Sequence, residues 1–216
     1  PSRLEPELFR QVFWGRSYYL ILMIPLFVDC SGRRVVIFGG GAVAARKAGY
    51  FADQAHVLVV SRSFVHKIGT LPVTKKSMDI AAAADEKISS LIGNAFLVIG
   101  ALSDPVQNNR IGKLCKKNGI LFNNADGDKG TVILPAVSSG KNFTIAISTG
   151  GSSPAVSRFI REHLEKDLPE LDAMIGLQHR LREGLKKEVP DQARRNEILR
   201  RVLDDPAVWK LLKKDP

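Results

Sequence analysis

Residues 33–44 read RRVVIFGGGAVA, and this stretch indicates which class of fold to expect. The apolar run before the glycines predicts a buried parallel strand, because such a strand is covered on both faces. The residues after the glycines have the composition of a helix. Gly39, Gly41 and Ala44 follow the spacing G-x-G-x-x-A between this strand and this helix, which is the context that a dinucleotide-binding turn requires.

Each small residue of this turn has its own physical purpose. Gly39 allows the tight change of direction, Gly41 leaves room for a pyrophosphate beside the backbone, and Ala44 lets the helix pack closely on the sheet. The helix start then offers free N–H groups and partial positive charge to the phosphates. A glycine-rich turn without a ligand is the alternative, and the strand–turn–helix context favours the dinucleotide. The predicted cofactor-binding residues of this turn are Gly39, Gly40, Gly41, Ala42 and Val43.

The ends of two further strands extend the predicted cofactor site. The second strand, residues 56–60, leads into a Ser-Arg-Ser sequence at the position where an Asp or Glu would bind the ribose diol of NAD. Ser and Arg there suit the 2′-phosphate of NADP, and a solvated surface arginine is the alternative, so the choice between NAD and NADP stays open. A second loop follows the fourth strand and is expected to line the same crevice. The cofactor-binding residues added here are Ser61, Arg62, Ser63, Ala101, Ser103 and Asp104.

Strand and helix patterns alternate as far as residue 122. This alternation predicts an α/β fold with a Rossmann-like parallel sheet that helices cover on both faces. Apolar or β-branched runs predict strands at residues 33–38, 56–60, 73–77, 95–99 and 120–122. Helical composition predicts helices at residues 42–53, 81–91 and 105–118, the last of which Gly119 closes.

The pattern changes after Asn123. Residues 131–137 and 143–148 predict two strands of a hairpin, joined by a turn-rich loop. The remaining chain is helical and strongly charged, and prolines 169, 190 and 206 divide it into successive helices. The expected organisation is an N-terminal extension (1–22), a dinucleotide-binding Rossmann-like domain (23–125), a small β-hairpin region (126–151) and a C-terminal helical domain (152–216).

Composition limits the classes of partner. The formal net charge of +10 favours an anionic ligand. The basic residues of the tail are spread among acids without interleaved aromatics, so we expect no nucleic acid. The apolar run 18–28 is interrupted by Pro25 and is too short to span a bilayer, so we interpret it as a lead-in that packs on the core and expect no membrane. Cys30 and Cys115 form no metal or redox motif, which is typical of reduced thiols in a cytoplasmic enzyme.

Several motifs together resemble the precorrin-2 dehydrogenase family, which is also found as the N-terminal part of siroheme synthases. The likeness covers roughly residues 22–165. Two of the motifs, GGGxVAxRK and ISTGGxSPA, lie about a hundred residues apart and are together far more specific than the glycine turn alone. The matching stretches are PLFV (25–28), GGGAVAARK (39–47), NNAD (123–126), LPA (134–136) and IAISTGGSSPA (145–155).

The resemblance implies a function. Members of the family use NAD to oxidise precorrin-2 to sirohydrochlorin on the route to siroheme, and some also insert ferrous iron into the product. The resemblance also implies a homodimer, whose interface involves the hairpin region and the helices. The resemblance places the catalytic aspartate of the family at Asp126, with Asp128 as a nearby rival.

The residues themselves agree with part of this implication. Asp126 follows the fifth predicted strand, at the edge where such sheets bind ligands, and a dehydrogenase needs a proton acceptor near its cofactor. A turn-forming aspartate is the alternative. Ser153 and Pro154 form a helix start that suits a carboxylate of the substrate, while a plain capped helix with a solvated basic face explains the same pattern. The predicted substrate-binding residues are Thr149, Ser153 and Arg158, with Arg161 beside them.

Three rival functions remain at this point. A bifunctional enzyme would add ferrochelatase activity, with Asp126 taking protons from the pyrrole nitrogens. A module that senses NAD without chemistry would use the same glycine turn. Nucleic-acid binding would use the basic tail. The four histidines do not have metal-ligand spacing, so we expect no resident metal.

Overall fold

The parallel sheet is the centre of the fold. The computed structural model describes residues 23–126 and 130–213, and within them five strands form one parallel sheet in the order β3-β2-β1-β4-β5. Strand order reverses between β1 and β4, and ligands of such sheets bind outside the strand ends at that point. The strands are β1 (Arg34–Phe38), β2 (His56–Ser61), β3 (Thr74–Ser77), β4 (Leu97–Gly100) and β5 (Leu121–Asn124).

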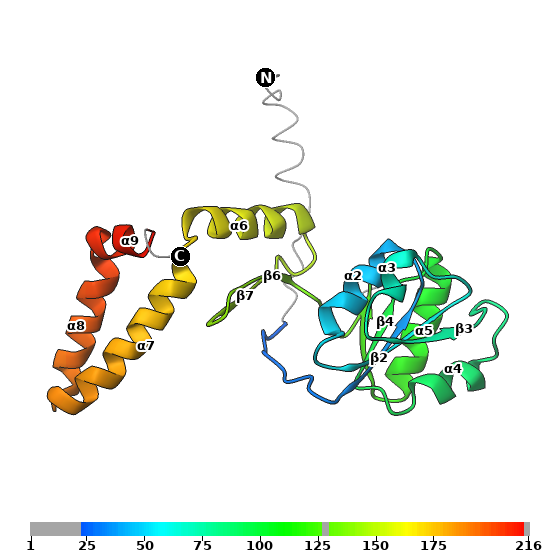
Figure 1. Ribbon diagram of the computed structural model, residues 1–216. Helices are drawn as coiled ribbons and strands as arrows, with labels where there is room; N and C mark the ends of the chain where they lie inside the picture. The colour runs from blue at the N-terminus through cyan, green and yellow to red at the C-terminus, as the bar shows by residue number, and fades with distance from the viewer. Residues whose placement is uncertain (1–22, 127–129, 214–216) are drawn as a thin grey trace, which may run out of the picture.

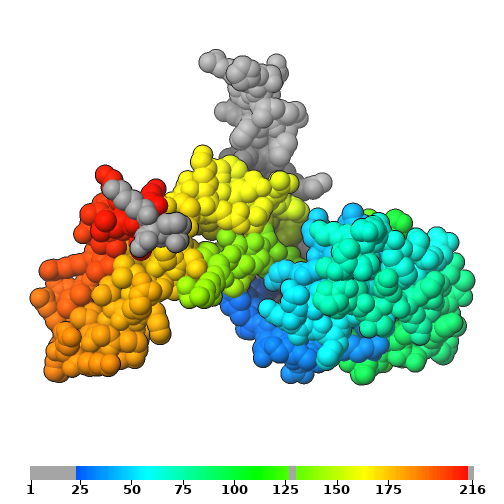
Figure 2. All heavy atoms as spheres, in the orientation of Figure 1, coloured from blue at the N-terminus to red at the C-terminus, as the bar shows by residue number. Residues whose placement is uncertain are grey.

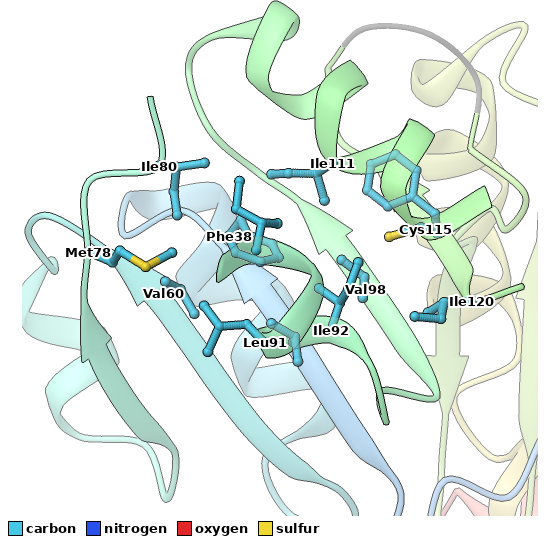
Figure 3. Close-up of a cluster of buried hydrophobic side chains, with 13 residues drawn as sticks. Phe38, Val60, Met78, Ile80, Leu91, Ile92, Val98, Ile111, Cys115 and Ile120 are labelled. Carbon is cyan, nitrogen blue, oxygen red and sulfur yellow. The ribbon is translucent and has the colours of Figure 1, made fainter. Parts of the chain in front are cut away.

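Helices cover both faces of this sheet, as the alternating pattern predicts (Figure 1). One face packs on α4 and α5, and Figure 3 shows Phe38, Val60 and Val98 of the sheet near Ile111 and Cys115 of α5. The other face packs on α2 and α3 through a second buried cluster. The helices of this part are α2 (Ala42–Phe51), α3 (His66–Gly69), α4 (Asp85–Ile92) and α5 (Pro105–Lys117).

The rest of the described chain forms a hairpin followed by helices. Helix α6 packs against the antiparallel hairpin, and α7, α8 and α9 pack on one another. Figure 2 shows α7 to α9 on the side of the hairpin away from the parallel sheet. The prolines divide the helices as predicted, because Pro169 lies between α6 and α7, Pro190 lies between α7 and α8, and Pro206 stands at the first position of α9. The elements are β6 (Ala136–Ser139), β7 (Thr144–Ile147), α6 (Pro154–Asp167), α7 (Leu171–Glu188), α8 (Gln192–Asp204) and α9 (Pro206–Leu212).

Two predicted elements have different bounds in the structure. The helix expected from residue 81 begins at Asp85, because the Asp79 carboxylate accepts hydrogen bonds from the N–H groups of Ala81 (3.0 Å) and Ala82 (3.4 Å) and holds a turn there. The strand expected at residues 131–137 pairs only from Ala136.

The apolar lead-in, residues 18–28, differs from its prediction in position. Residues 23–28 are exposed, so the prediction that this segment packs on the core is wrong for its described part. Its first residues and the predicted extension 1–22 lie outside the described residues. Among the helices of the described residues, none is long and apolar enough to cross a membrane.

Candidate functional site

A cleft of about 660 Å³ lies at the carboxyl ends of the parallel strands. Its wall contains every residue predicted to bind the cofactor, together with Asp126, so the structure brings together loops that are far apart in the sequence. The predicted lining residues are Gly39, Gly40, Gly41, Ala42, Val43, Ser61, Arg62, Ser63, Ala101, Ser103 and Asp104.

The first two glycines of the turn are closely packed against neighbouring loops. Gly39 has a positive φ of 131°, and a Cβ there would collide with the backbone of Ala101. A Cβ on Gly40 would collide with the carbonyl oxygen of Ser63. Side chains are therefore excluded at both positions by the neighbouring loops of the cleft, before any ligand is considered.

Gly41 is different, because a Cβ at this position would have no atom within 4 Å. The space beside it opens into the cleft. Gly41 is also the N-cap of α2, and no side chain of the described residues caps the first turn of that helix. Free N–H groups and an open approach are what a pyrophosphate needs, so this turn fits a dinucleotide.

The loop after β2 forms one end of the cleft. Arg62 is well exposed, and its guanidinium Nη1 lies 3.6 Å from the carboxylate Oδ2 of Asp79, which follows β3. This pair is a weak surface ion pair, because both side chains reach solvent. The cationic group that sequence analysis placed here therefore has an acidic neighbour from the adjacent strand.

The loop after β4 forms the other wall and leads into α5. Asp104 is the N-cap of α5, and its carboxylate accepts hydrogen bonds from the N–H groups of Val106 (2.8 Å) and Gln107 (3.4 Å). Pro105 stands at the first helical position. One Asp104 oxygen is thus used by the helix, and this cap fixes where the loop meets the cleft.

Asp126 stands at the rim of the cleft after β5. Its N–H donates to Oδ1 of Asn124 at 3.3 Å, and its carbonyl oxygen accepts from Nδ2 of Asn108 at 3.1 Å. The N–H of Ala125 donates to the carbonyl oxygen of Gly100 at 2.9 Å, which fastens the loop to β4. The rival Asp128 lies outside the described residues.

The residues predicted to bind substrate do not line the cleft: Thr149 and Ser153 precede α6, and Arg158 lies within that helix. Thr149 is held locally, since its hydroxyl accepts from the N–H of Ser153 and contacts the carbonyl oxygen of the same residue, both at 3.0 Å. The Ser153 hydroxyl accepts from the N–H of Val156 at 3.3 Å as the N-cap.

The arginines of α6 pair within their own helix. The guanidinium of Arg158 donates to Glu162 at 2.7 Å, and this contact lowers the pKa of the Glu162 carboxyl. Arg161 binds Glu165 at 3.1 Å. The local pairs match the pattern of a solvated basic face, and binding of substrate by Arg158 stays a prediction.

Sequence analysis missed several residues of the site. Met78, Ile80 and Gln107 line the cleft without any motif that marks them. Lys47 does not line the cleft; its Nζ donates to Oδ1 of Asn123 at 2.9 Å, and burial lowers the pKa of this amine. Within residues 23–126 and 130–213, no group of three or more His, Cys, Asp or Glu residues has the arrangement of a metal site.

Comparisons with known proteins agree with this geometry. A family profile described as "Putative NAD(P)-binding" matches residues 26–136, and one described as "Sirohaem biosynthesis protein central" matches residues 143–167. The precorrin-2 dehydrogenase of Methanosarcina barkeri is 42% identical over 191 residues, which cover 86% of this chain and 85% of that protein.

A longer relative and a solved structure extend the comparison. The siroheme synthase of Azotobacter vinelandii is 29% identical over 88% of this chain, which spans only 41% of that protein. The solved structure of SirC, a precorrin-2 dehydrogenase, has a TM-score of 0.65 at 24% identity and covers 89% of this chain and 98% of its own. The structural likeness supports the α/β sheet, the hairpin and the following helices as one fold.

Proposed function

The chain belongs to the precorrin-2 dehydrogenase family, and from this premise we propose that its cleft binds a nicotinamide dinucleotide and that the protein oxidises precorrin-2 to sirohydrochlorin. The observation that carries the proposal is the cleft itself. It is lined both by the glycine turn, where open space beside Gly41 suits a pyrophosphate, and by Asp126 at the rim. The protein is therefore an oxidoreductase of siroheme biosynthesis.

The chain's own residues have two tasks in this reaction. The bound nicotinamide supplies the acceptor for a hydride, so that each turnover removes one hydride and one proton from the substrate. The first task is to hold the dinucleotide, through the glycine turn, the loop after β2 and the loop after β4. The second task is to accept the proton.

We assign the proton to Asp126. Asp126 stands at the rim of the cleft, next to the loop after β4 that forms one of its walls. A general base has to lie within reach of the reacting carbon, and the exposed rim allows a large tetrapyrrole to approach from solvent. The other proposed contacts of the substrate are Thr149, Ser153 and Arg158, which suit its acetate and propionate groups.

For the cofactor, we propose NAD rather than NADP. The Arg62 guanidinium alone would favour a 2′-phosphate, but the Asp79 carboxylate lies beside it and would repel that phosphate. Replacing Asp79 with Ala should therefore raise the ratio of kcat/KM for NADP to that for NAD by about tenfold, equivalent to ~1.4 kcal/mol. Steady-state kinetics with both cofactors measures this ratio, and an unchanged ratio would refute the role of Asp79.

We also propose that the protein is a homodimer in the cytoplasm. Its α6 carries exposed apolar residues, Val156, Phe159 and Ile160, at the spacing of one helix face. A contiguous exposed apolar face is typical of an interface. Cys30 and Cys115 are both free thiols, which fits a reducing compartment.

Replacing Asp126 with Asn tests the proposed chemistry. The amide keeps the size of the side chain and cannot accept the proton, so kcat should fall about a hundredfold or more, whereas the cofactor Kd should stay within about twofold. Anaerobic turnover of precorrin-2 and a fluorescence titration with cofactor measure the two quantities. Asp53→Asn is the control, because Asp53 is an exposed carboxylate outside this cleft. Undiminished turnover of Asp126→Asn would defeat the assignment.

A further inference from the structure

Asn108 is a fully buried polar residue that no motif explains. It lies at the end of the first turn of α5 and has no exposed surface. A buried amide is costly unless its donors and acceptor are satisfied, so its partners show why it is there.

All of its side-chain hydrogen bonds go to the two loops of the cleft. Its Oδ1 accepts from the N–H of Leu102 at 3.1 Å, and its Nδ2 donates to the carbonyl oxygen of the same residue at 2.9 Å. The same Nδ2 also donates to the carbonyl oxygen of Asp126 at 3.1 Å. One amide thus joins the loop after β4, which lines the cofactor cleft, to the residue at the substrate rim.

The neighbouring backbone is shaped around this amide. A Cβ on Gly100, the last residue of β4, would lie 3.0 Å from Oδ1 of Asn108 and 3.1 Å from the ring of Phe122. Any side chain there would push Asn108 away from its partners. The adjacent Asn109 binds the side chain of Asn124 at 3.0 Å, so consecutive residues of α5 hold the loop that carries Asp126.

We propose that Asn108 is a positioning residue for the oxidation, which sets the distance between the Asp126 carboxylate and the cofactor bound against the loop at Leu102. This inference rests on the proposed function of Asp126. The physical reason is that a shift of about 1 Å at a reacting group lowers the rate of chemistry far more than it lowers binding. Asn108 touches neither substrate nor cofactor in this account.

Two substitutions of Asn108 test the proposal in the full-length protein. Asn108→Asp keeps the shape of the side chain and removes the amide donor. Asn108→Ser keeps a polar group on a side chain too short to reach both Leu102 and Asp126. In each variant we expect kcat to fall at least tenfold, while the KM for precorrin-2 and the Kd for NAD stay within about threefold. Circular dichroism shows whether each variant is folded at the assay temperature.

Ile111→Val is the matched control. Ile111 is buried on the same helix close to Asn108 and makes no polar contact through its side chain, so its truncation weakens packing alone. The control should keep the kcat of the wild-type protein. If the Asn108 variants keep the wild-type kcat, or lose kcat only as much as Ile111→Val does, Asn108 is structural and the proposal is overturned.

A double substitution separates this proposal from the proposed function. If Asn108 acts through Asp126, then adding Asn108→Ser to Asp126→Asn should slow the residual turnover by less than threefold. A further tenfold loss would mean that Asn108 acts by another route, and would overturn the inference alone. Wild-type turnover in Asp126→Asn would instead refute the role of Asp126, and the positioning role with it.

Discussion

At the scale of single residues, the three glycines of the turn differ in whether a Cβ would fit at their position. Gly39 and Gly40 are enclosed by the loops after β4 and β2, and a side chain on either would force those loops apart. Gly41 has open space beside it, and that space belongs to the cleft. The first two glycines are therefore needed by the fold, and we propose that the third is needed by the ligand.

This difference gives a direct prediction for Gly41→Ala. The variant should fold with the stability of the wild-type protein, because the new methyl group meets no atom within 4 Å and the φ of −86° suits alanine. Its Kd for NAD should rise at least tenfold, since the methyl group occupies the approach of the pyrophosphate. Thermal unfolding and a cofactor titration measure the two effects.

Gly39→Ala is the contrasting variant. It should lose stability as well as cofactor binding, because its φ of 131° and the nearby Ala101 backbone both oppose a side chain. If Gly41→Ala bound NAD as tightly as the wild-type protein, the pyrophosphate would not lie over this turn.

The sequence reveals some of these residues and not others. The glycine turn is a local pattern, so its spacing predicts both its structure and its ligand. Asp79 and Asn108 become part of the site only when separate strands and helices meet, and nothing adjacent in the sequence marks them. The role of Asp126 is proposed from a resemblance, because an aspartate among glycines looks like an ordinary turn.

At the scale of elements, α5 connects the core to the site. Asp104 caps its first turn, Asn108 at the end of that turn bonds to Leu102 and Asp126 of the cleft, and its buried face packs Ile111 and Cys115 on the sheet. The cap and the proline explain why this helix begins where the sequence predicts. Its position therefore determines the geometry of both loops at once.

The remaining element predictions differ from the structure for physical reasons. The helix α4 starts later than alanine content suggests, because Asp79 holds a turn ahead of it. Residues 131–135 have the composition of a strand, yet they form none, and the N–H of Val132 donates to the carbonyl oxygen of Phe122 in β5 at 3.0 Å. Val132 and Leu134 pack on the buried cluster, so the apolar pattern is satisfied without a hairpin partner.

The buried thiol of α5 predicts a pH dependence of stability. Burial raises the pKa of Cys115 from 9.0 to about 12. Between pH 9 and pH 12 the thiol of Cys115 loses its proton in the unfolded chain and keeps it in the folded chain. The free energy of unfolding therefore falls as pH rises. Its contribution is complete below pH 9 and is lost as pH approaches 12.

Comparison with Cys115→Ala isolates this effect. The wild-type protein should lose its stability advantage over the variant by up to ~1.4 kcal/mol per pH unit above pH 9. Lys47 has a lowered pKa and acts in the opposite direction, but it is present in both proteins and cancels. Urea unfolding at pH 8.0, 9.5 and 10.5 measures the difference. A constant difference over this range would contradict the raised pKa.

At the scale of the whole molecule, two exposed apolar segments lie outside the cleft. Residues 23–28 and the apolar face of α6 are exposed, and α6 packs on the hairpin (Figure 1). Sequence analysis expected the first of these segments on the core of its own chain. An exposed position is consistent with burial against a second copy, as the proposed homodimer requires.

Phe159→Glu tests this arrangement. Phe159 is 57% exposed on α6, and a buried glutamate at an interface has no partner to offset its desolvation. The wild-type protein should sediment as a dimer at micromolar concentration, and the variant as a folded monomer. Val106→Glu is the control, since Val106 is an exposed apolar residue on α5 and its replacement should leave the dimer intact. A monomeric wild-type protein, or a dimeric Phe159→Glu variant, would contradict the proposed interface.

The central claim is that this cleft supports the oxidation of precorrin-2 by a nicotinamide cofactor. The most direct test is an anaerobic assay of the purified protein with enzymatically generated precorrin-2 and NAD, following sirohydrochlorin and reduced cofactor by their absorbance. We predict that the two products appear together in equal amounts and at a rate proportional to the protein concentration. If the folded protein produced neither product, with NADP also tried, the cleft would hold a dinucleotide without performing this chemistry.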